Sequence, residues 1–216
     1  YDIKIPHPSS RSWHGQECLL DNFNIEAEYF DDQDMKKIQY VYHEPDHMRF
    51  DEKFFDLPDN TNISGFFQST LYFDDESTRE IIKRELSPKK EYLEEGRAYL
   101  KQLKSKNPGY KIVGVHMRRG DNTNHTNTSK ELNEMYGTTP DYDPNSFYGR
   151  YFTSAKEEFV NKKVKFLIFS GGSRDPGNNN ETDLEWCKRN FVSEDYLFSE
   201  ERNTMEDFCA IMACDH

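Results

Sequence analysis

The clearest hydrophobic pattern lies in the second half of the chain, where short apolar runs alternate with longer amphipathic segments. Residues 111–117 and 164–169 are apolar runs rich in β-branched and aromatic side chains, which predicts two buried strands. A shorter strand is expected at 196–198. Apolar side chains recur with helical spacing at 147–159, 184–191 and 205–212. This alternation predicts an α/β fold, in which helices cover both faces of a parallel sheet.

The first half of the chain is less regular. An alternating segment at 38–42 predicts a short strand, and apolar spacing predicts a helix from Ser77. Ser87 and Pro88 have the residue types of an N-cap and a first helical position, so they predict the start of a second helix. Residues 107–109 (Asn-Pro-Gly) are expected to terminate that helix.

The loops after the two main strands carry the polar residues that matter most. Arg118 and Arg119 follow the first strand directly, and residues 170–180 follow the second. In parallel α/β sheets, ligands bind beyond the carboxyl ends of the strands. We therefore expect the two loops to face one crevice.

Composition narrows the classes of partner. Hydrophobic residues make up only 34% of the chain, but 16 Phe and 13 Tyr supply enough apolar area for a folded core. A formal net charge of −12 argues against nucleic acid or an anionic membrane as a bulk partner. No apolar run approaches the ~20 residues of a membrane-spanning helix, so bulk membrane contact is not expected. The four Cys have no metal-binding spacing and are expected to be buried apolar residues.

The pair Arg118-Arg119 is the strongest chemical candidate. A guanidinium offers a planar fork of donors that matches two phosphate oxygens, so the pair can bind a diphosphate. A surface ion pair with Asp121 is an equally good interpretation of the spacing alone. His116 is either a packed strand residue or a catalytic one, and Asp121 either caps a loop or accepts a proton from a hydroxyl.

These residues form a pattern known from one family. His116, Arg118, Arg119, Gly120 and Asp121 follow a Val-Gly-Val strand, which resembles the first signature of α-1,2-fucosyltransferases, glycosyltransferase family 11. Segments of residues 57–73, 169–188 and 206–216 resemble further stretches of that family, in the same order. The resemblance covers residues 40–216.

The resemblance implies a GT-B-like fold, with a Rossmann-type donor-binding lobe at 107–216 and part of an acceptor-side lobe at 1–106. It implies inverting transfer of fucose from GDP-fucose to a galactoside hydroxyl, with a nucleotide-sugar donor, a glycan acceptor and no metal cofactor. Under this interpretation the candidate residues have two roles. The catalytic candidates are His116, Arg118 and Asp121, and the donor-binding candidates are Arg118, Arg119, Gly120, Ser170 and Asp183.

The sequence departs from the family pattern in three places. The Gly-rich opening loop and the final motif are missing, so we expect the chain to be part of a longer enzyme. The acidic pair of the second segment is replaced by Gly171-Gly172, and Asp175 or Asp183 could take its place. This replacement puts recognition of the base, or the identity of the donor, in question.

Two other functions stay open. Asp141 and Asp143 match the Asp-x-Asp pattern with which metal-dependent GT-A glycosyltransferases bind Mn²⁺ or Mg²⁺ through oxygen ligands. The chain could also be a non-catalytic, transferase-like domain that binds sugar. The loop of residues 122–143 is a candidate for acceptor contact. The compartment is expected to be the cytoplasm for a viral or bacterial source, and the Golgi lumen for an animal source.

Overall fold

The structure is a computed structural model that describes residues 4–6, 19–117, 143–145, 147–170, 182–200 and 202–216. The candidates Arg118, Arg119, Gly120 and Asp121 lie outside these residues. The chain divides into two compact units, Tyr1–Lys89 (unit 1) and Lys90–His216 (unit 2). The predicted lobe boundary at residue 106 stays a prediction about the whole enzyme. In the described chain, the helix 90–106 belongs with unit 2.

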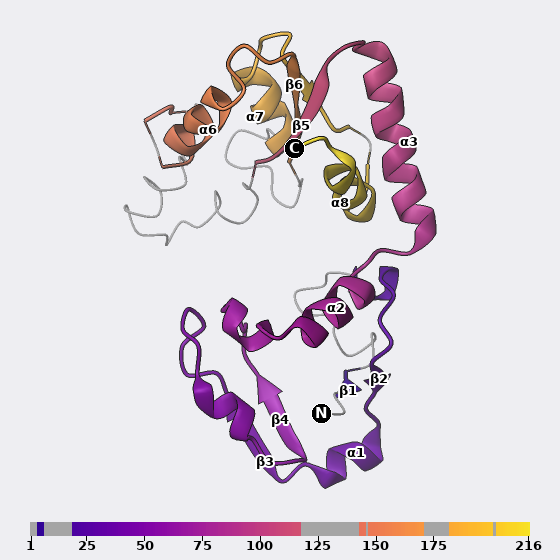
Figure 1. The fold of residues 1–216 in the computed structure, drawn as a ribbon, viewed down its shortest axis with the longest axis vertical. Coiled ribbons are helices and arrows are strands. Elements are labelled where there is room, and N and C mark those ends of the chain that lie inside the picture. Colours follow the sequence, from indigo (N-terminus) through magenta and orange to yellow (C-terminus); the bar gives the residue numbers. More distant parts are fainter. Residues whose placement is uncertain (1–3, 7–18, 118–142, 146, 171–181, 201) are drawn as a thin grey trace. The chain divides into compact units, whose positions relative to one another are not determined.

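Unit 2 is built on a parallel sheet. Its three strands are β5 (Lys111–His116), β6 (Val164–Phe169) and β7 (Tyr196–Phe198), in the order β5-β6-β7. Figure 1 labels β5 and β6. Lys111 pairs with Val164 and His116 with Phe169, so β5 and β6 end side by side. The α/β class and the parallel sheet expected from the sequence are confirmed.

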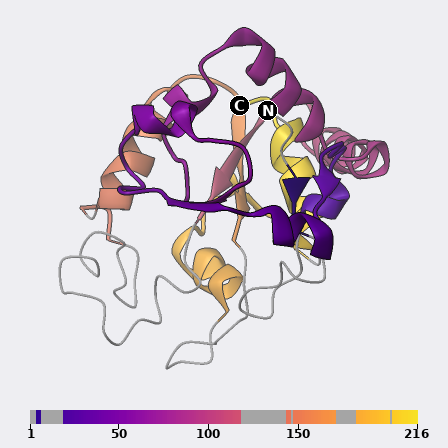
Figure 2. The ribbon, with the colours of Figure 1, turned by 90° about the horizontal axis from the view of Figure 1, so that it is seen from below.

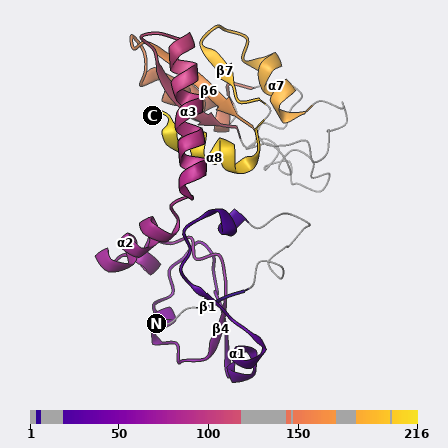
Figure 3. The same ribbon diagram turned by 90° about the vertical axis from the view of Figure 1, so that its right-hand side faces the viewer.

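Helices cover both faces of this sheet. Helices α3 (Lys90–Lys106) and α8 (Thr204–Ala213) lie on one face, and α6 (Phe147–Glu157) and α7 (Asp183–Asn190) lie on the other. Figure 3 shows α3 and α8 on one side of the strands and α7 on the opposite side, and Figure 2 shows the same layers from below.

Side chains that alternate along the strands pack against the helices on the two faces of the sheet. On the α3 and α8 side, Ile112 and Phe169 pack with Leu100 of α3 and Ala210 of α8. The opposite cluster contains Val113, Phe166, Ile168, Phe152, Trp186 and Cys187. Successive residues of a strand point to opposite faces, so a strand covered on both faces is expected to be largely apolar. All six residues of β6 are buried and five are apolar; the sixth, Lys165, donates from Nζ to the Glu194 carbonyl at 2.7 Å.

Unit 1 contains short elements. Strand β3 (Tyr40–His43) pairs in parallel with β4 (Thr61–Ser64), and β1 (Lys4–Ile5) pairs with β2 (Glu28–Tyr29). Its helical segments are α1 (Asp32–Lys37), α2 (Glu76–Glu85), η2 (Leu19–Asn22), η3 (Glu52–Asp56) and η4 (Thr70–Phe73).

An aromatic cluster organises this unit. Tyr72 is buried, and the rings of Phe50, Phe54 and Phe67 pack edge-on around it at centroid distances of 5.0–5.2 Å. Asp51 joins two tyrosines to the cluster, because its carboxylate accepts from the Tyr42 hydroxyl at 2.9 Å and its N–H donates to the Tyr72 hydroxyl at 3.0 Å. Offset and edge-to-face aromatic pairs of this kind are favourable beyond the area that they bury.

The predicted start of the second helix is wrong by two residues. Ser87 does not cap a helix, because its carbonyl accepts a hydrogen bond from the Asn24 N–H at 3.1 Å and the Lys89 N–H donates to Asn22 at 2.9 Å. These bonds keep the segment extended around Pro88, and α3 begins only at Lys90. The strand expected at 38–42 is β3, which begins at Tyr40.

Candidate functional site

Of the sequence candidates, His116 and Ser170 lie at the carboxyl ends of β5 and β6, and the described part of the signature stops there. His116 is the last residue of β5 and is exposed. Met117 follows it, and its N–H donates to the Phe169 carbonyl at 2.8 Å. The rest of the signature, residues 118–121, begins directly after this hydrogen bond, and the positions of its side chains stay a prediction.

Ser170 ties the ends of β5 and β6 together. Its side chain is buried, and its hydroxyl donates to the Met117 carbonyl at 3.0 Å. Met117 and Ser170, the last described residues after the two strands, therefore lie side by side. The bond also gives Ser170 a structural task, while its predicted contact with the donor stays a prediction.

Asp183 is the first residue of α7, where it is partly buried. Thr182 caps this helix: its hydroxyl oxygen accepts from the Glu185 N–H, and the Glu185 carboxylate accepts from the Thr182 N–H at 2.7 Å. A carboxylate in the first turn also interacts favourably with the helix dipole. This position explains Asp183 structurally, and its role in donor binding stays a prediction. Gly171, Gly172 and Asp175 lie outside the described residues.

The structure places a polar cluster at the same edge, made of Tyr99, Ser199, Arg202 and Asp207 and called here the carboxyl-edge cluster. Ser199 follows β7 directly, and its N–H donates to the Ile168 carbonyl at 2.9 Å. Its buried hydroxyl donates to Asp207 Oδ1 at 2.5 Å. Asp207 stands in the first turn of α8, so this bond joins the helix to the end of the sheet.

Arg202 supplies the positive charge of the cluster. Its side chain is only 11% exposed, and its guanidinium carbon lies 4.1 Å from the centroid of the Tyr99 ring. Its Nη2 donates to the Glu206 carbonyl at 2.9 Å, and its Nε lies 3.5 Å from Asp207 Oδ1. A desolvated guanidinium over an aromatic face gains a cation–π interaction that partly offsets its burial.

Burial is the main influence on Asp207, and it raises the pKa of this carboxyl above its ordinary value. The Ser199 hydrogen bond and the positive charges of Arg202 and His116 act in the opposite direction on that pKa. His116 ends β5 and Ser199 follows β7 in the parallel sheet, so the cluster and the predicted catalytic histidine share one edge of the sheet. Burial likewise raises the pKa of Tyr99.

Sequence reasoning missed this cluster for a specific reason. Asp207 lies in the segment 206–216 that resembles the family, but no role was attached to it. Ser199 could have been found from its place directly after a predicted strand. Arg202 carries no motif, and its burial against Tyr99 joins residues that are 103 positions apart, which only the fold reveals.

The described residues contain no group of three or more His, Cys, Asp or Glu side chains that could hold a metal ion. Of the Asp-x-Asp pair, Asp141 lies outside them, and Asp143 Oδ1 accepts from the Asn145 N–H at 2.8 Å in a turn. Cys187 and Cys209 are buried free thiols, which confirms the expected apolar role for these two. In the part of the chain that can be described, no helix has the length and apolar character needed to cross a membrane.

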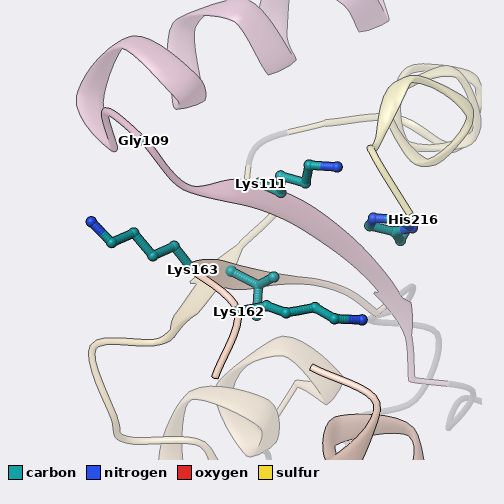
Figure 4. Close-up of a pocket in the computed structure, with 6 residues that line it drawn as sticks. Gly109, Lys111, Lys162, Lys163 and His216 are labelled. Carbon is teal, nitrogen blue, oxygen red and sulfur yellow. The ribbon is translucent and has the colours of Figure 1, made fainter. Parts of the chain in front are cut away.

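A pocket of about 400 Å³ lies at the opposite, amino end of the sheet. It is lined by Gly109, Lys111, Lys162, Lys163, Val164 and His216 (Figure 4). The side chains of Lys162 and Lys163 extend in opposite directions, so the lysines do not converge on one anion. Because it lies at the amino end of the sheet, this pocket is separate from the candidate site at the carboxyl edge.

Comparison with known proteins covers almost the whole chain. The family model described as "Glycosyl transferase family 11" matches residues 10–216, which includes unit 1 from residue 10 onward, the whole of unit 2 and all the candidate residues. No curated protein and no solved structure matches the chain. The chain therefore belongs to glycosyl transferase family 11, an α-fucosyltransferase family, and is a glycosyltransferase.

Proposed function

We propose that this protein transfers fucose from GDP-fucose to a hydroxyl group of a galactoside, with inversion at the anomeric carbon. The observation that carries the proposal is the family match over residues 10–216, together with a signature that begins at the carboxyl end of β5. In this proposal the architecture is GT-B-like, and unit 2 supplies the donor-binding side.

The reaction assigns separate tasks to the signature residues. The acceptor oxygen attacks C1 of fucose, the bond between C1 and the phosphate oxygen breaks, and the electron pair leaves with GDP. Attack on the face opposite the leaving group inverts the configuration at C1. Arg118 and Arg119 bind the diphosphate and stabilise its developing charge, so that no metal ion is needed. His116 and Asp121 are the candidates for accepting the hydroxyl proton.

The nucleotide selectivity of the full-length protein tests this proposal. We expect GDP and GDP-fucose to raise the melting temperature more than UDP or UDP-galactose does. A ligand that binds only the folded state adds about 2.7 kcal/mol of stability at a hundred times its Kd. Equal shifts from the UDP compounds, or no shift from GDP, would contradict a GDP-fucose donor.

A further inference from the structure

Asp207 is a carboxylate with one oxygen in use and one unused. The Ser199 hydroxyl at 2.5 Å and the Arg202 Nε at 3.5 Å both approach Oδ1. Oδ2 makes no hydrogen bond with any residue that the structure describes. The side chain is only 22% exposed, so this arrangement leaves a largely desolvated carboxylate with a spare acceptor atom.

Arg202 is held firmly on the other side of this carboxylate. The Tyr99 ring at 4.1 Å and the Glu206 carbonyl at 2.9 Å fix the plane of the guanidinium. Its Nε is buried and has no hydrogen-bond partner among the described residues, because the contact with Asp207 lies outside hydrogen-bond geometry. A buried cation is costly unless an anion compensates it, and Asp207 is the anion in reach. Contacts of this kind are often long without ligand and tighten when a ligand binds.

The cluster stands where a ligand of this fold would lie. His116 and Ser199 mark the carboxyl ends of β5 and β7, and Ser170 marks that of β6 between them. Parallel α/β sheets bind their ligands beyond these strand ends. Two close-packed helices keep Asp207 in this position, because α8 crosses α3 at Gly96 with no room for a side chain.

We propose that Asp207 accepts a hydrogen bond from the bound nucleotide-sugar through Oδ2, and that Arg202 is the positioning residue that keeps this carboxylate ionised and in place. This inference rests on the proposed function. A carboxylate attracts N–H and O–H groups and repels phosphate. The group that it binds therefore belongs to the nucleoside or to the fucose, and not to the diphosphate.

The charges around Asp207 determine how binding depends on pH. The groups that face it are Tyr99 from α3, His116 from β5, Ser199 and Arg202 from the loop before α8, and Glu206 from α8 itself. Burial raises the pKa of Asp207, and Arg202 lowers it. Binding that needs the ionised carboxylate is lost as the pH falls through this pKa. Removing the charge of Arg202 raises the pKa, so the loss on acidification should begin at a higher pH.

The experiment measures the affinity of the full-length protein for GDP and for GDP-fucose by calorimetry, from neutral to mildly acidic pH. We expect Asp207→Asn to weaken binding by about tenfold or more, the typical effect of losing a hydrogen bond to a charged group. The acid limb of binding is the pH range over which affinity is lost on acidification. Arg202→Met should move this acid limb to higher pH, whereas Arg202→Lys should keep it near that of the wild type. Asp215→Asn is the matched control, because Asp215 is an ion-paired carboxylate at the amino end of β5.

The two nucleotide probes separate the possible sources of the hydrogen-bond donor. Equal losses for GDP and GDP-fucose in Asp207→Asn place the donor on the nucleoside. A loss confined to GDP-fucose places it on the sugar. Ser199→Ala offers a second, smaller change at the same oxygen, and it should also move the acid limb to higher pH, because the hydroxyl that lowers the pKa of Asp207 is gone.

The inference is overturned if folded Asp207→Asn binds both nucleotides as tightly as the wild type, or if Arg202→Met and Ser199→Ala leave the acid limb in place. Melting temperatures identify any variant that fails to fold, and Ser199→Ala then decides the question. If the wild type binds neither GDP nor GDP-fucose, the proposed function fails, and this inference fails with it. The two failures are thus distinguished by the wild-type measurement alone.

Discussion

Asp207 is the residue at which the polar interactions of the carboxyl edge meet. One hydroxyl, one buried guanidinium and the charge of His116 all act on its carboxylate. Burial raises the pKa of this carboxyl while the hydroxyl and the positive charges lower it, an opposition that is common where a protein binds a ligand. The proposed diphosphate site depends on two further cations, Arg118 and Arg119.

Arg118→Lys tests the proposed diphosphate contact at the scale of one residue. Lysine keeps the charge but loses the planar fork that binds two oxygens at once. Loss of a preorganised donor that acts on transition-state charge costs about 2.7–4 kcal/mol, or roughly a hundred- to a thousandfold in rate. We expect Arg118→Lys to lower kcat/KM within this range, and Arg119→Lys to have a smaller effect.

The size of the rate loss in Arg118→Lys distinguishes a phosphate contact from a surface ion pair. A surface ion pair contributes about 1 kcal/mol at most, which is only a few-fold in rate. If a folded Arg118→Lys protein retains more than about a tenth of the wild-type rate, Arg118 is not the main phosphate contact.

Asp215 offers a second prediction at this scale, away from the site. Its carboxylate accepts from Lys104 Nζ and from the Ile112 N–H, both at 2.8 Å, and the lysine is the main reason that its pKa lies below the usual range. A lowered folded-state pKa contributes stability above the ordinary pKa, and this stability is lost as the pH falls through the folded value.

We therefore expect Asp215→Asn to unfold at lower urea concentration than the wild type at neutral pH. The difference should shrink as the pH falls below about 4, the ordinary range of the carboxyl group. A difference that stayed constant down to acidic pH would show that the carboxylate charge is not what stabilises this contact.

The positions of single residues could be predicted where the local sequence determines them, but not where tertiary contacts do. His116 could be placed at a strand end because a run of β-branched residues leads up to it. Arg202 could not be found, because it is buried against the ring of Tyr99 in α3, which is far away in sequence. Motifs record local order, and a contact between distant segments leaves no local pattern.

At the scale of elements, the crossing of α3 and α8 sets the geometry of the site. A Cβ atom at Gly96 would lie 2.6 Å from the backbone carbonyl carbon of Cys209. At the other end of the crossing, Asn203 caps α8: its side chain accepts from the Glu206 N–H at 3.0 Å. The two features together fix the first turn of α8, which carries Asp207.

Gly96→Ala should therefore destabilise unit 2. Overpacking a close contact costs about 1–3 kcal/mol, which outweighs the gain of up to about 1 kcal/mol that alanine brings to a helix interior. Urea unfolding followed by circular dichroism measures the net change. Arg97→Ala, at the adjacent exposed position of α3, is the control and should change stability by less than about 0.5 kcal/mol. Equal or greater stability of Gly96→Ala would mean that the helices can separate without cost.

Elements buried on both faces were the most predictable. Strand β6 has the bounds predicted from an apolar run that only Lys165 interrupts, and β7 also has its predicted bounds. The start of α3 was misplaced because Ser87 and Pro88 have capping residue types, but the residues on either side of Pro88 are hydrogen-bonded elsewhere: the Ser87 carbonyl to Asn24 and the Lys89 N–H to Asn22. Local preference decides a boundary only where no other segment offers hydrogen bonds.

At the scale of the molecule, the chain combines two different kinds of unit. Unit 2 is a parallel sheet between helices, with a core on each face. Unit 1 has short strands and an aromatic cluster centred on Tyr72, and its weak periodicity made it the less predictable half. The family match spans both units, so the enzyme's activity is expected to need the whole chain.

Transfer itself is the measurement that tests the central claim most directly. The full-length protein is incubated with lactose and either GDP-fucose or UDP-galactose, with and without EDTA, and the product is analysed by mass spectrometry and NMR. We predict fucosylated lactose from GDP-fucose alone, with a linkage opposite in anomeric configuration to the donor and a yield that EDTA leaves unchanged. Transfer from UDP-galactose in place of GDP-fucose, or activity abolished by EDTA and restored by Mn²⁺, would contradict the proposal and favour a metal site at Asp141 and Asp143.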